Sequence, residues 1–256
     1  MIDIHQLTSD SVTQYGKDEV LRAIEKAIEE KGNLTAYEKA MIRVKAKRAA
    51  GILSVEETVM KVDLCALDCK IPERFRPCTI DNYEILHEEA KQALSMINSY
   101  ITDADNVVKQ GKSLLLIGEC GTGKTHIGCA ILRAFYKLGY QGQYMNLYDL
   151  FQQVKSAWKN YDHQDIQLIK KLAQQDILVI DEVGVQYNTQ AEKMIIYDLF
   201  NKRYQQKKPS IIISNLPVYS ANNKDACLAC ILGERVIDRL RDGGKQIVFN
   251  WGSFRR

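Results

Sequence analysis

The residues best suited to chemistry lie in the middle of the chain, where Gly118–Thr125 reads GECGTGKT. The apolar run 113–117 precedes this segment, and a helical pattern from His126 to about Lys137 follows it. A glycine, four residues and then Gly-Lys-Thr between a strand and a helix is the spacing of a P-loop. Its glycines let backbone N–H groups turn inward around phosphate oxygens, and the helix adds the positive end of its dipole.

This loop predicts a site for ATP and Mg²⁺. The ammonium of Lys124 would reach the β- and γ-phosphates, and the hydroxyl of Thr125 would ligate the cation. A glycine-rich turn that binds nothing is the alternative. The residues expected to contact the nucleotide are Gly118, Glu119, Cys120, Gly121, Thr122, Gly123, Lys124, Thr125 and His126.

Two carboxylates follow the second strongly apolar run, Ile177–Ile180. An apolar strand that ends in Asp181 and Glu182 has the Walker B arrangement, which brings acids to the carboxyl edge of the sheet beside a P-loop. Asp181 would hold Mg²⁺, and Glu182 would act as general base on the attacking water. Glu182 therefore distinguishes a hydrolase from a nucleotide-gated binder, although a solvated turn is the alternative.

Three more polar residues are candidates for the same site. Asn215 ends the apolar run 210–214, where an amide would lie near the γ-phosphate and the attacking water; capping the next helix is a compatible alternative. Arg235 and Arg239 lie four residues apart, on one face of a predicted helix. Either could reach the γ-phosphate of a neighbouring subunit, or form surface ion pairs with Glu234 or Asp238.

The elements that must position these residues alternate between apolar strands and helices. Strands are predicted at 113–117, 143–147, 177–180, 210–214 and 246–249, with helices at 84–99, 126–137, 148–175, 189–206 and up to 241. This alternation is typical of an α/β fold with a parallel sheet covered by helices. Only a few residues, ending in Gly252–Arg256, follow the last strand, so no C-terminal helical lid is expected.

The first seventy residues instead predict a small α-helical domain. Lys17–Lys31 forms an amphipathic pattern, and capping signals open further helices at Thr35 and Ser54. We expect a helical domain at 1–70, a proline-containing linker at 71–80 and the ATPase domain at 81–256. A basic cluster at 43–48 is either a solvated helix face or a nucleic-acid contact.

Composition limits the remaining possibilities. The net charge of +3 on 256 residues permits nucleic-acid binding without arguing for it. Seven cysteines with neither a signal peptide nor an apolar run of transmembrane length indicate a reducing, cytoplasmic setting without membrane insertion. Zinc binding by Cys65, Cys69 and Cys78, with His5 or His87, is an open alternative to buried thiols. Buried thiols are also expected at Cys227 and Cys230.

Three segments carry a resemblance to a known family: ILVIDEVGVQ (177–186), LGERVIDRLR (232–241) and VFNWGSFR (248–255). With the P-loop, they make the chain from about Phe75 onward similar to the DnaC-type helicase loaders of the DnaC/IstB-like AAA+ group. The resemblance implies an AAA+ fold, slow ATP hydrolysis used as a switch, homo-oligomers on the partner, and delivery of a DnaB-type replicative helicase hexamer onto single-stranded DNA. The N-terminal domain would bind the helicase.

The resemblance also assigns residues. It implies that Asn215 is a sensor, that Arg239 is the finger with Arg235 nearby, and that Trp158 and Thr189 contact single-stranded DNA. A buried Trp158 is the alternative, and Ala191 departs from the tyrosine that the family places there. Two other functions stay open: an IstB-like ATPase that targets transposition, and a nucleotide-gated binding or inhibitor protein with negligible turnover.

Overall fold

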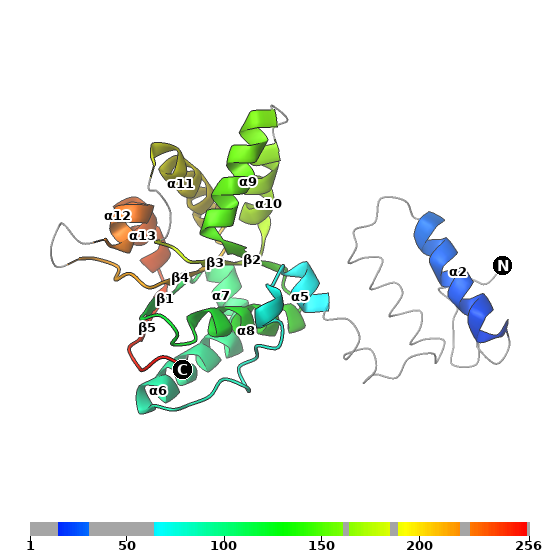
Figure 1. Ribbon diagram of the computed structural model, residues 1–256, viewed down its shortest axis with the longest axis horizontal. Helices are drawn as coiled ribbons and strands as arrows, with labels where there is room; N and C mark the ends of the chain where they lie inside the picture. The colour runs from blue at the N-terminus through cyan, green and yellow to red at the C-terminus, as the bar shows by residue number, and fades with distance from the viewer. Residues whose placement is uncertain (1–14, 31–63, 161–163, 185–188, 221–225, 255–256) are drawn as a thin grey trace. The chain divides into compact units, whose positions relative to one another are not determined.

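The computed structural model describes residues 15–30, 64–160, 164–184, 189–220 and 226–254 (Figure 1). The chain divides into two compact units between Asp68 and Cys69. The first unit contains the predicted amphipathic helix, α2 (Lys17–Glu30), with Val20 and Ile24 fully buried, and a short helix α5 (Leu64–Asp68). The helices expected at Thr35 and Ser54, the basic cluster 43–48 and His5 lie outside the described residues.

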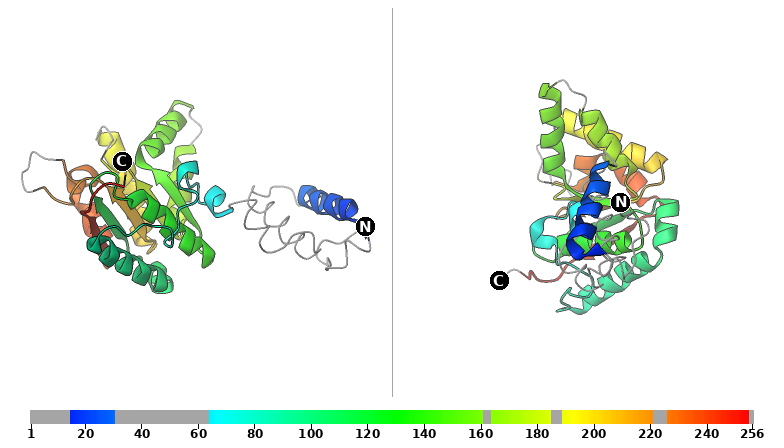
Figure 2. Two further views of the ribbon diagram at one scale, coloured as in Figure 1. Left: turned by 60° about the horizontal axis from the view of Figure 1, so that its bottom comes forward. Right: turned by 90° about the vertical axis from the view of Figure 1, so that its right-hand side faces the viewer.

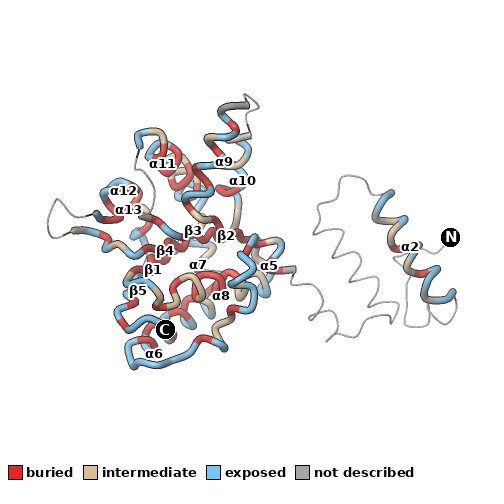
Figure 3. Tube along the Cα trace, viewed as in Figure 1, coloured by how far each residue is buried: buried red, intermediate tan, exposed pale blue. Residues whose placement is uncertain are grey.

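The second unit is built on a five-stranded parallel sheet, and it confirms the predicted fold class. Its strands are β1 (Leu114–Gly118), β2 (Gly142–Asn146), β3 (Ile177–Asp181), β4 (Ser210–Ser214) and β5 (Lys245–Phe249). They lie in the order β2-β3-β4-β1-β5. Every residue of β3 and β4 is buried because helices cover both faces of the sheet (Figure 3). The carboxyl end of β4 therefore lies between those of β1 and β3.

The helices form a layer on each face of the sheet (Figures 1 and 2). One face carries α6 (Glu88–Thr102) and α8 (Lys124–Lys137), and α7 (Ala104–Gln110) packs against α6. The other face is covered by α9 (Leu147–Asn160), α10 (Gln164–Gln174), α11 (Gln190–Gln205), α12 (Leu228–Leu232) and α13 (Glu234–Arg241). Residues 84–87 are not helical, so α6 begins four residues later than the sequence predicts, and α7 was not predicted.

The segment expected to be a linker is attached to the larger unit. The carbonyl of Cys69 accepts a hydrogen bond from the N–H of Tyr144 in β2 (2.7 Å). Arg133 of α8 donates to the carbonyl of Cys78 (3.3 Å) and to that of Arg76. These bonds hold residues 69–78, with the short 3₁₀ helix η2 (Glu73–Phe75), against β2 and α8.

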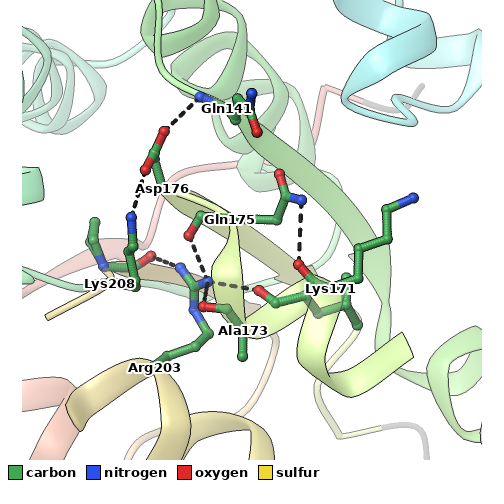
Figure 4. Close-up of polar contacts among 9 residues, drawn as sticks. Gln141, Lys171, Ala173, Gln175, Asp176, Arg203 and Lys208 are labelled. Atoms are coloured by element: carbon green, nitrogen blue, oxygen red, sulfur yellow. Dashed lines mark hydrogen bonds and ion pairs between the residues drawn. The ribbon is translucent and has the colours of Figure 1, made fainter. Parts of the chain in front are cut away.

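A buried arginine, Arg203, connects α11 with the end of α10 and the start of β4 (Figure 4). Arg203 of α11 is 1% exposed; its Nη1 donates to the carbonyls of Leu172 (2.8 Å) and Gln175 (2.9 Å), and its Nε donates to the hydroxyl of Ser210 (2.9 Å). The carbonyls at the end of α10 lack helical partners, and the guanidinium supplies them. Burial lowers the pKa of Arg203 to about 9. This contact joins the end of α10 to the start of β4.

The described cysteines include one disulfide and several buried thiols. Cys227 and Cys230 form a disulfide, so the prediction of thiols at this pair was wrong; the first caps α12 and the second lies in its first turn, which brings their Cα atoms 5.2 Å apart. Cys65, Cys69 and Cys78 are buried and not disulfide-bonded, and the described residues contain no cluster of metal ligands. No described helix is both long and apolar enough to span a bilayer.

Candidate nucleotide site

A cleft of about 700 Å³ opens at the carboxyl edge of β1, β3 and β4. It is lined by the P-loop, by the residues that follow β3 and β4, and by side chains from two segments far away in sequence. The structure thereby brings together the predicted nucleotide residues, since Lys124, Thr125, Asp181, Glu182 and Asn215 all line it. Its other walls include Arg74, Phe75, Tyr83, Glu84 and Phe254.

Backbone geometry explains the glycines of the loop. Gly118, Gly121 and Gly123 have φ angles of 136°, 81° and 87°, a region that side chains disfavour. A Cβ on Gly118 would also lie 2.1 Å from the carbonyl oxygen of Phe249 in β5. The end of β1 can therefore lie this close to the end of β5 only because residue 118 has no side chain.

Lys124 is held inside the loop that it is expected to serve. Lys124 is only 5% exposed, and its Nζ donates to the carbonyls of Gly118 (2.9 Å) and Glu119 (2.5 Å). The positive charge thus lies within the P-loop at the start of α8, where the helix dipole has the same sign. Both features favour an anion such as a triphosphate.

The predicted metal ligands, Thr125 and Asp181, touch each other. The hydroxyl of Thr125 donates to Oδ2 of Asp181 (2.8 Å), which also accepts from the hydroxyl of Tyr144 (2.9 Å). Asp181 is 2% exposed, and this burial raises the pKa of its carboxyl, with the hydrogen bonds from Thr125 and from the N–H of Glu182 partly opposing the rise. A buried carboxylate beside a hydroxyl is an oxygen ligand set that fits Mg²⁺.

Glu182 occupies an unusual backbone position next to this pair. Its φ is 56°, which is uncommon for a residue with a side chain, and its N–H donates to Oδ1 of Asp181 (2.7 Å). The side chain is exposed toward the cleft and accepts a hydrogen bond from the amide of Asn146 at the end of β2. Strained residues of this kind cluster at functional sites, so the geometry favours a chemical role for the carboxylate.

Asn215 lies immediately after β4, between the P-loop and Glu182. Its side chain is exposed and lines the cleft. The next described helix, α12, is capped by Cys227 instead, so Asn215 does not serve as its N-cap. Its amide is therefore available to a ligand at the place where sequence reasoning put it.

Arg235 and Arg239 do not line this chain's own cleft. The guanidinium of Arg239 lies 5.5 Å from the ring centres of both Tyr197 and Tyr204 on α11, and its Nη1 donates to the carbonyl of Arg235 (3.1 Å). Arg235 is exposed. Within the described part of the chain, neither arginine forms an ion pair with Glu234 or Asp238. Their proposed role on a neighbouring subunit stays a prediction.

The two residues expected to contact DNA lie on different helices. Trp158 of α9 is 44% exposed, which excludes the buried alternative, and its Nε1 donates to Asp165 of α10 (2.7 Å). Thr189 caps α11: its hydroxyl accepts from the N–H of Glu192 (3.3 Å), and the carboxylate of Glu192 accepts from the N–H of Thr189 (3.0 Å). This capping box gives Thr189 a structural role that is independent of DNA.

Sequence reasoning missed several residues of the site. Asn146 is the last residue of a buried strand, much as Asn215 directly follows one, and that signal could have identified it. Tyr144 lies on the same strand but carries no such signal. Tyr83 and Phe254 reach the P-loop from the segment before α6 and from the end of the chain, so only the fold shows them. His126, which was predicted, lines the cleft while its Nε2 donates to the carbonyl of Thr79 (2.8 Å).

This chain is similar to several known proteins. The replicative helicase loader DnaC of Escherichia coli K12 is 32% identical over 179 residues, which are 70% of this chain and 69% of the loader. The loader of the same name from Buchnera aphidicola subsp. Baizongia pistaciae is 33% identical over 73% of this chain and 72% of its own. A crystal structure of the DnaC helicase loader superposes with a TM-score of 0.60 at 26% identity, covering 69% of this chain and 99% of that one.

The family described as IstB-like ATP binding protein matches residues 80–256, which include all five strands and every residue predicted to bind the nucleotide. The resemblance seen in the sequence is thereby confirmed. The curated proteins to which it is similar include replicative helicase loaders, and the chain itself belongs to the family of IstB-like ATP-binding proteins.

Proposed function

We propose that this protein is an ATP-dependent loader that delivers a ring-shaped replicative helicase of the DnaB type onto single-stranded DNA. One observation carries the proposal: the five residues predicted to bind and hydrolyse ATP line one cleft of a chain that is 32% identical to a helicase loader over most of its length. Hydrolysis would serve as a timing step that releases the loader. The N-terminal helical unit would contact the helicase.

In this proposal, charged and polar side chains of the cleft would promote hydrolysis by acting on the attacking water and on the phosphates. Glu182 would accept the proton of a water that attacks the γ-phosphate, and the amide of Asn215 would orient that water. Lys124 would neutralise charge on the phosphate oxygens. Thr125 and Asp181 would hold Mg²⁺, which would offset the negative charge of the triphosphate. Arg239 from a neighbouring copy of this chain would complete the site, so that turnover depends on oligomerisation.

The substitution Glu182→Gln tests the chemical part of the proposal. It keeps the shape of the side chain and removes the base, so we expect ATP turnover to fall by about 10²-fold or more while nucleotide binding persists. Glu89→Gln removes an equal charge from the exposed face of α6 and serves as the control. Wild-type turnover in Glu182→Gln would sink the assignment of Glu182.

Complex formation tests the biological part. The full chain would be mixed with a hexameric replicative helicase and ATP, and the mass of the complex measured together with helicase loading on circular single-stranded DNA. A stable complex that loads the ring supports the proposal. Recovery of a transposase instead, with no binding to the helicase, would favour the IstB-like role in transposition. Binding without measurable turnover in either assembly would favour a nucleotide-gated inhibitor.

A further inference from the structure

The P-loop is contacted from outside by residues to which the sequence analysis assigned no role in the nucleotide site. We infer that Tyr83 and Trp251 are positioning residues for the triphosphate: they hold the carbonyl of Thr122 and thereby aim the N–H of Gly123 at the phosphates. The inference rests on the P-loop binding a nucleotide, which is part of the proposed function.

Two donors converge on this single carbonyl. The hydroxyl of Tyr83 donates to the oxygen of Thr122 (2.7 Å), and Nε1 of Trp251 donates to the same oxygen and to the Tyr83 hydroxyl (3.2 Å each). A carbonyl oxygen has two lone pairs, and both are engaged here. Tyr83 and Trp251 are 7% and 5% exposed, so water competes little for these bonds.

The peptide unit transmits this contact to the site. The carbonyl of Thr122 and the N–H of Gly123 belong to one planar trans peptide, so they point in opposite directions. Donors that fix the carbonyl on the outer side therefore fix the N–H on the other side. Gly123 lines the cleft, and its N–H makes no hydrogen bond to any other residue that the structure describes. It is a preset donor for a phosphate oxygen.

The neighbouring peptide is held in the same way. The N–H of Phe254 donates to the carbonyl of Gly121 (2.9 Å), which turns the N–H of Thr122 in the opposite direction. The ring of Phe254 also meets that of Tyr83 edge to face, with centres 5.5 Å apart. The segment after β5 thus holds one P-loop carbonyl by its backbone and the next by the indole of Trp251.

Gly123 is required by this contact as well as by its own backbone angle. A Cβ there would lie 2.5 Å from the ring of Tyr83, in addition to the strain at a φ of 87°. The ring therefore fits directly against the loop. Removing only the hydroxyl of Tyr83 leaves this ring packing intact, which separates the hydrogen bond from the packing.

The test compares Tyr83→Phe, Trp251→Phe and the double variant with Tyr100→Phe. Tyr100 is a matched control because its buried hydroxyl donates to the carbonyl of Lys112 (2.8 Å), which does not line the cleft. The dissociation constants of a non-hydrolysable ATP analogue, ADP and adenosine would be measured by titration calorimetry and competition. The unfolding temperature without nucleotide would be measured alongside.

We expect each single variant to bind the ATP analogue about threefold to tenfold more weakly, because one of two donors is lost. The double variant should lose more than the product of the two single losses, since the carbonyl is then free to rotate. Adenosine affinity should stay within twofold, because it has no phosphate. Tyr100→Phe should bind the analogue like the wild type.

Several results would overturn the inference. One is unchanged affinity for the ATP analogue in the double variant; another is an equal loss for adenosine, which would show a general disturbance of the cleft. A fall in unfolding temperature without a phosphate-dependent loss would show that the two residues only support the fold. If the wild type itself binds no ATP analogue, the proposed function fails first and the inference with it.

Discussion

The side-chain amide of Asn146 joins the ends of two neighbouring strands by donating a hydrogen bond to the carboxylate of Glu182. Its Oδ1 accepts from the N–H of Tyr148 (2.9 Å), so the amide is fixed on both sides. The contact follows from register, because Asn146 of β2 lies opposite Asp181 of β3. A carboxylate held in this way has to release the amide before it can orient freely toward water.

Asn146 therefore restrains the proposed base. We expect Asn146→Ala to raise steady-state ATP turnover of the isolated protein by about tenfold, since a hydrogen bond to a charged group contributes roughly 1.5–3 kcal/mol. Asn146→Asp keeps an oxygen that accepts from the N–H of Tyr148, but its carboxylate repels that of Glu182. This variant should therefore also raise ATP turnover. Turnover that is unchanged or lower in both variants would contradict this role.

Asp181 should make the nucleotide-free protein less stable at neutral pH than a neutral isostere would. Its folded-state pKa is raised from 3.8 by burial. Its contribution to stability is therefore fully present below that value and is lost as pH rises through the folded pKa. We expect Asp181→Asn to unfold at an equal or higher temperature than the wild type at pH 7, with no such advantage at acid pH, and to lose the stabilisation that Mg²⁺ with an ATP analogue gives the wild type.

The stability contributed by Glu192 should depend on pH in the opposite direction to that of Asp181, because the pKa of Glu192 is lowered and not raised. Burial alone would raise the pKa of its carboxyl, but hydrogen bonds from Lys155 (2.8 Å) and from the N–H of Thr189 lower it overall from 4.5. The stability it contributes is thus present above pH 4.5 and is lost as pH falls through the folded pKa. Because glutamine can keep the capping box, Glu192→Gln should cost about 1 kcal/mol at pH 7 in urea unfolding, and this cost should shrink as the pH falls below 4.5 and through the folded pKa. A constant difference across pH would refute the ion-pair explanation.

Mixing two inactive variants tests whether Arg239 acts on a neighbour. Glu182→Gln and Arg239→Ala should each hydrolyse ATP poorly. If the arginine serves the adjacent site, a mixed assembly contains interfaces with an intact Glu182 and an intact Arg239, and turnover should recover to about a quarter of wild type in a random 1:1 mixture. No recovery, with both variants still folded and assembling, would place Arg239 outside the catalytic interface.

The ring of Trp158 is exposed, and its proposed stacking on a DNA base can be tested. Stacking is worth about 1–3 kcal/mol per base, so Trp158→Ala should weaken binding of an oligothymidine by about fivefold or more, while Trp158→Phe should retain most of the affinity. Fluorescence anisotropy at two salt concentrations measures both variants. Because phosphate contacts are unchanged, the salt dependence should stay the same; equal affinities of Trp158→Ala and wild type would remove Trp158 from the DNA surface.

The sequence alone determined the parts of this protein that are local. Gly118–Thr125 specifies a phosphate loop through glycine conformations and one lysine. Apolar runs ending in Asp181 and Asn215 place polar groups at the edge of a parallel sheet, because all carboxyl ends of such strands meet there. The strands and most helices were predictable for the same reason, as each is encoded by its own periodicity.

Only the tertiary structure decided which residues contact these locally encoded segments. The strand order places β4 between β1 and β3, and it brings Asn146 to Glu182 across a sequence distance that no local pattern encodes. Tyr83 and Trp251 meet on one carbonyl of the P-loop from positions 168 residues apart. Such contacts arise only when the sheet and its flanking segments close around a common core, because no local interaction links the segments beforehand.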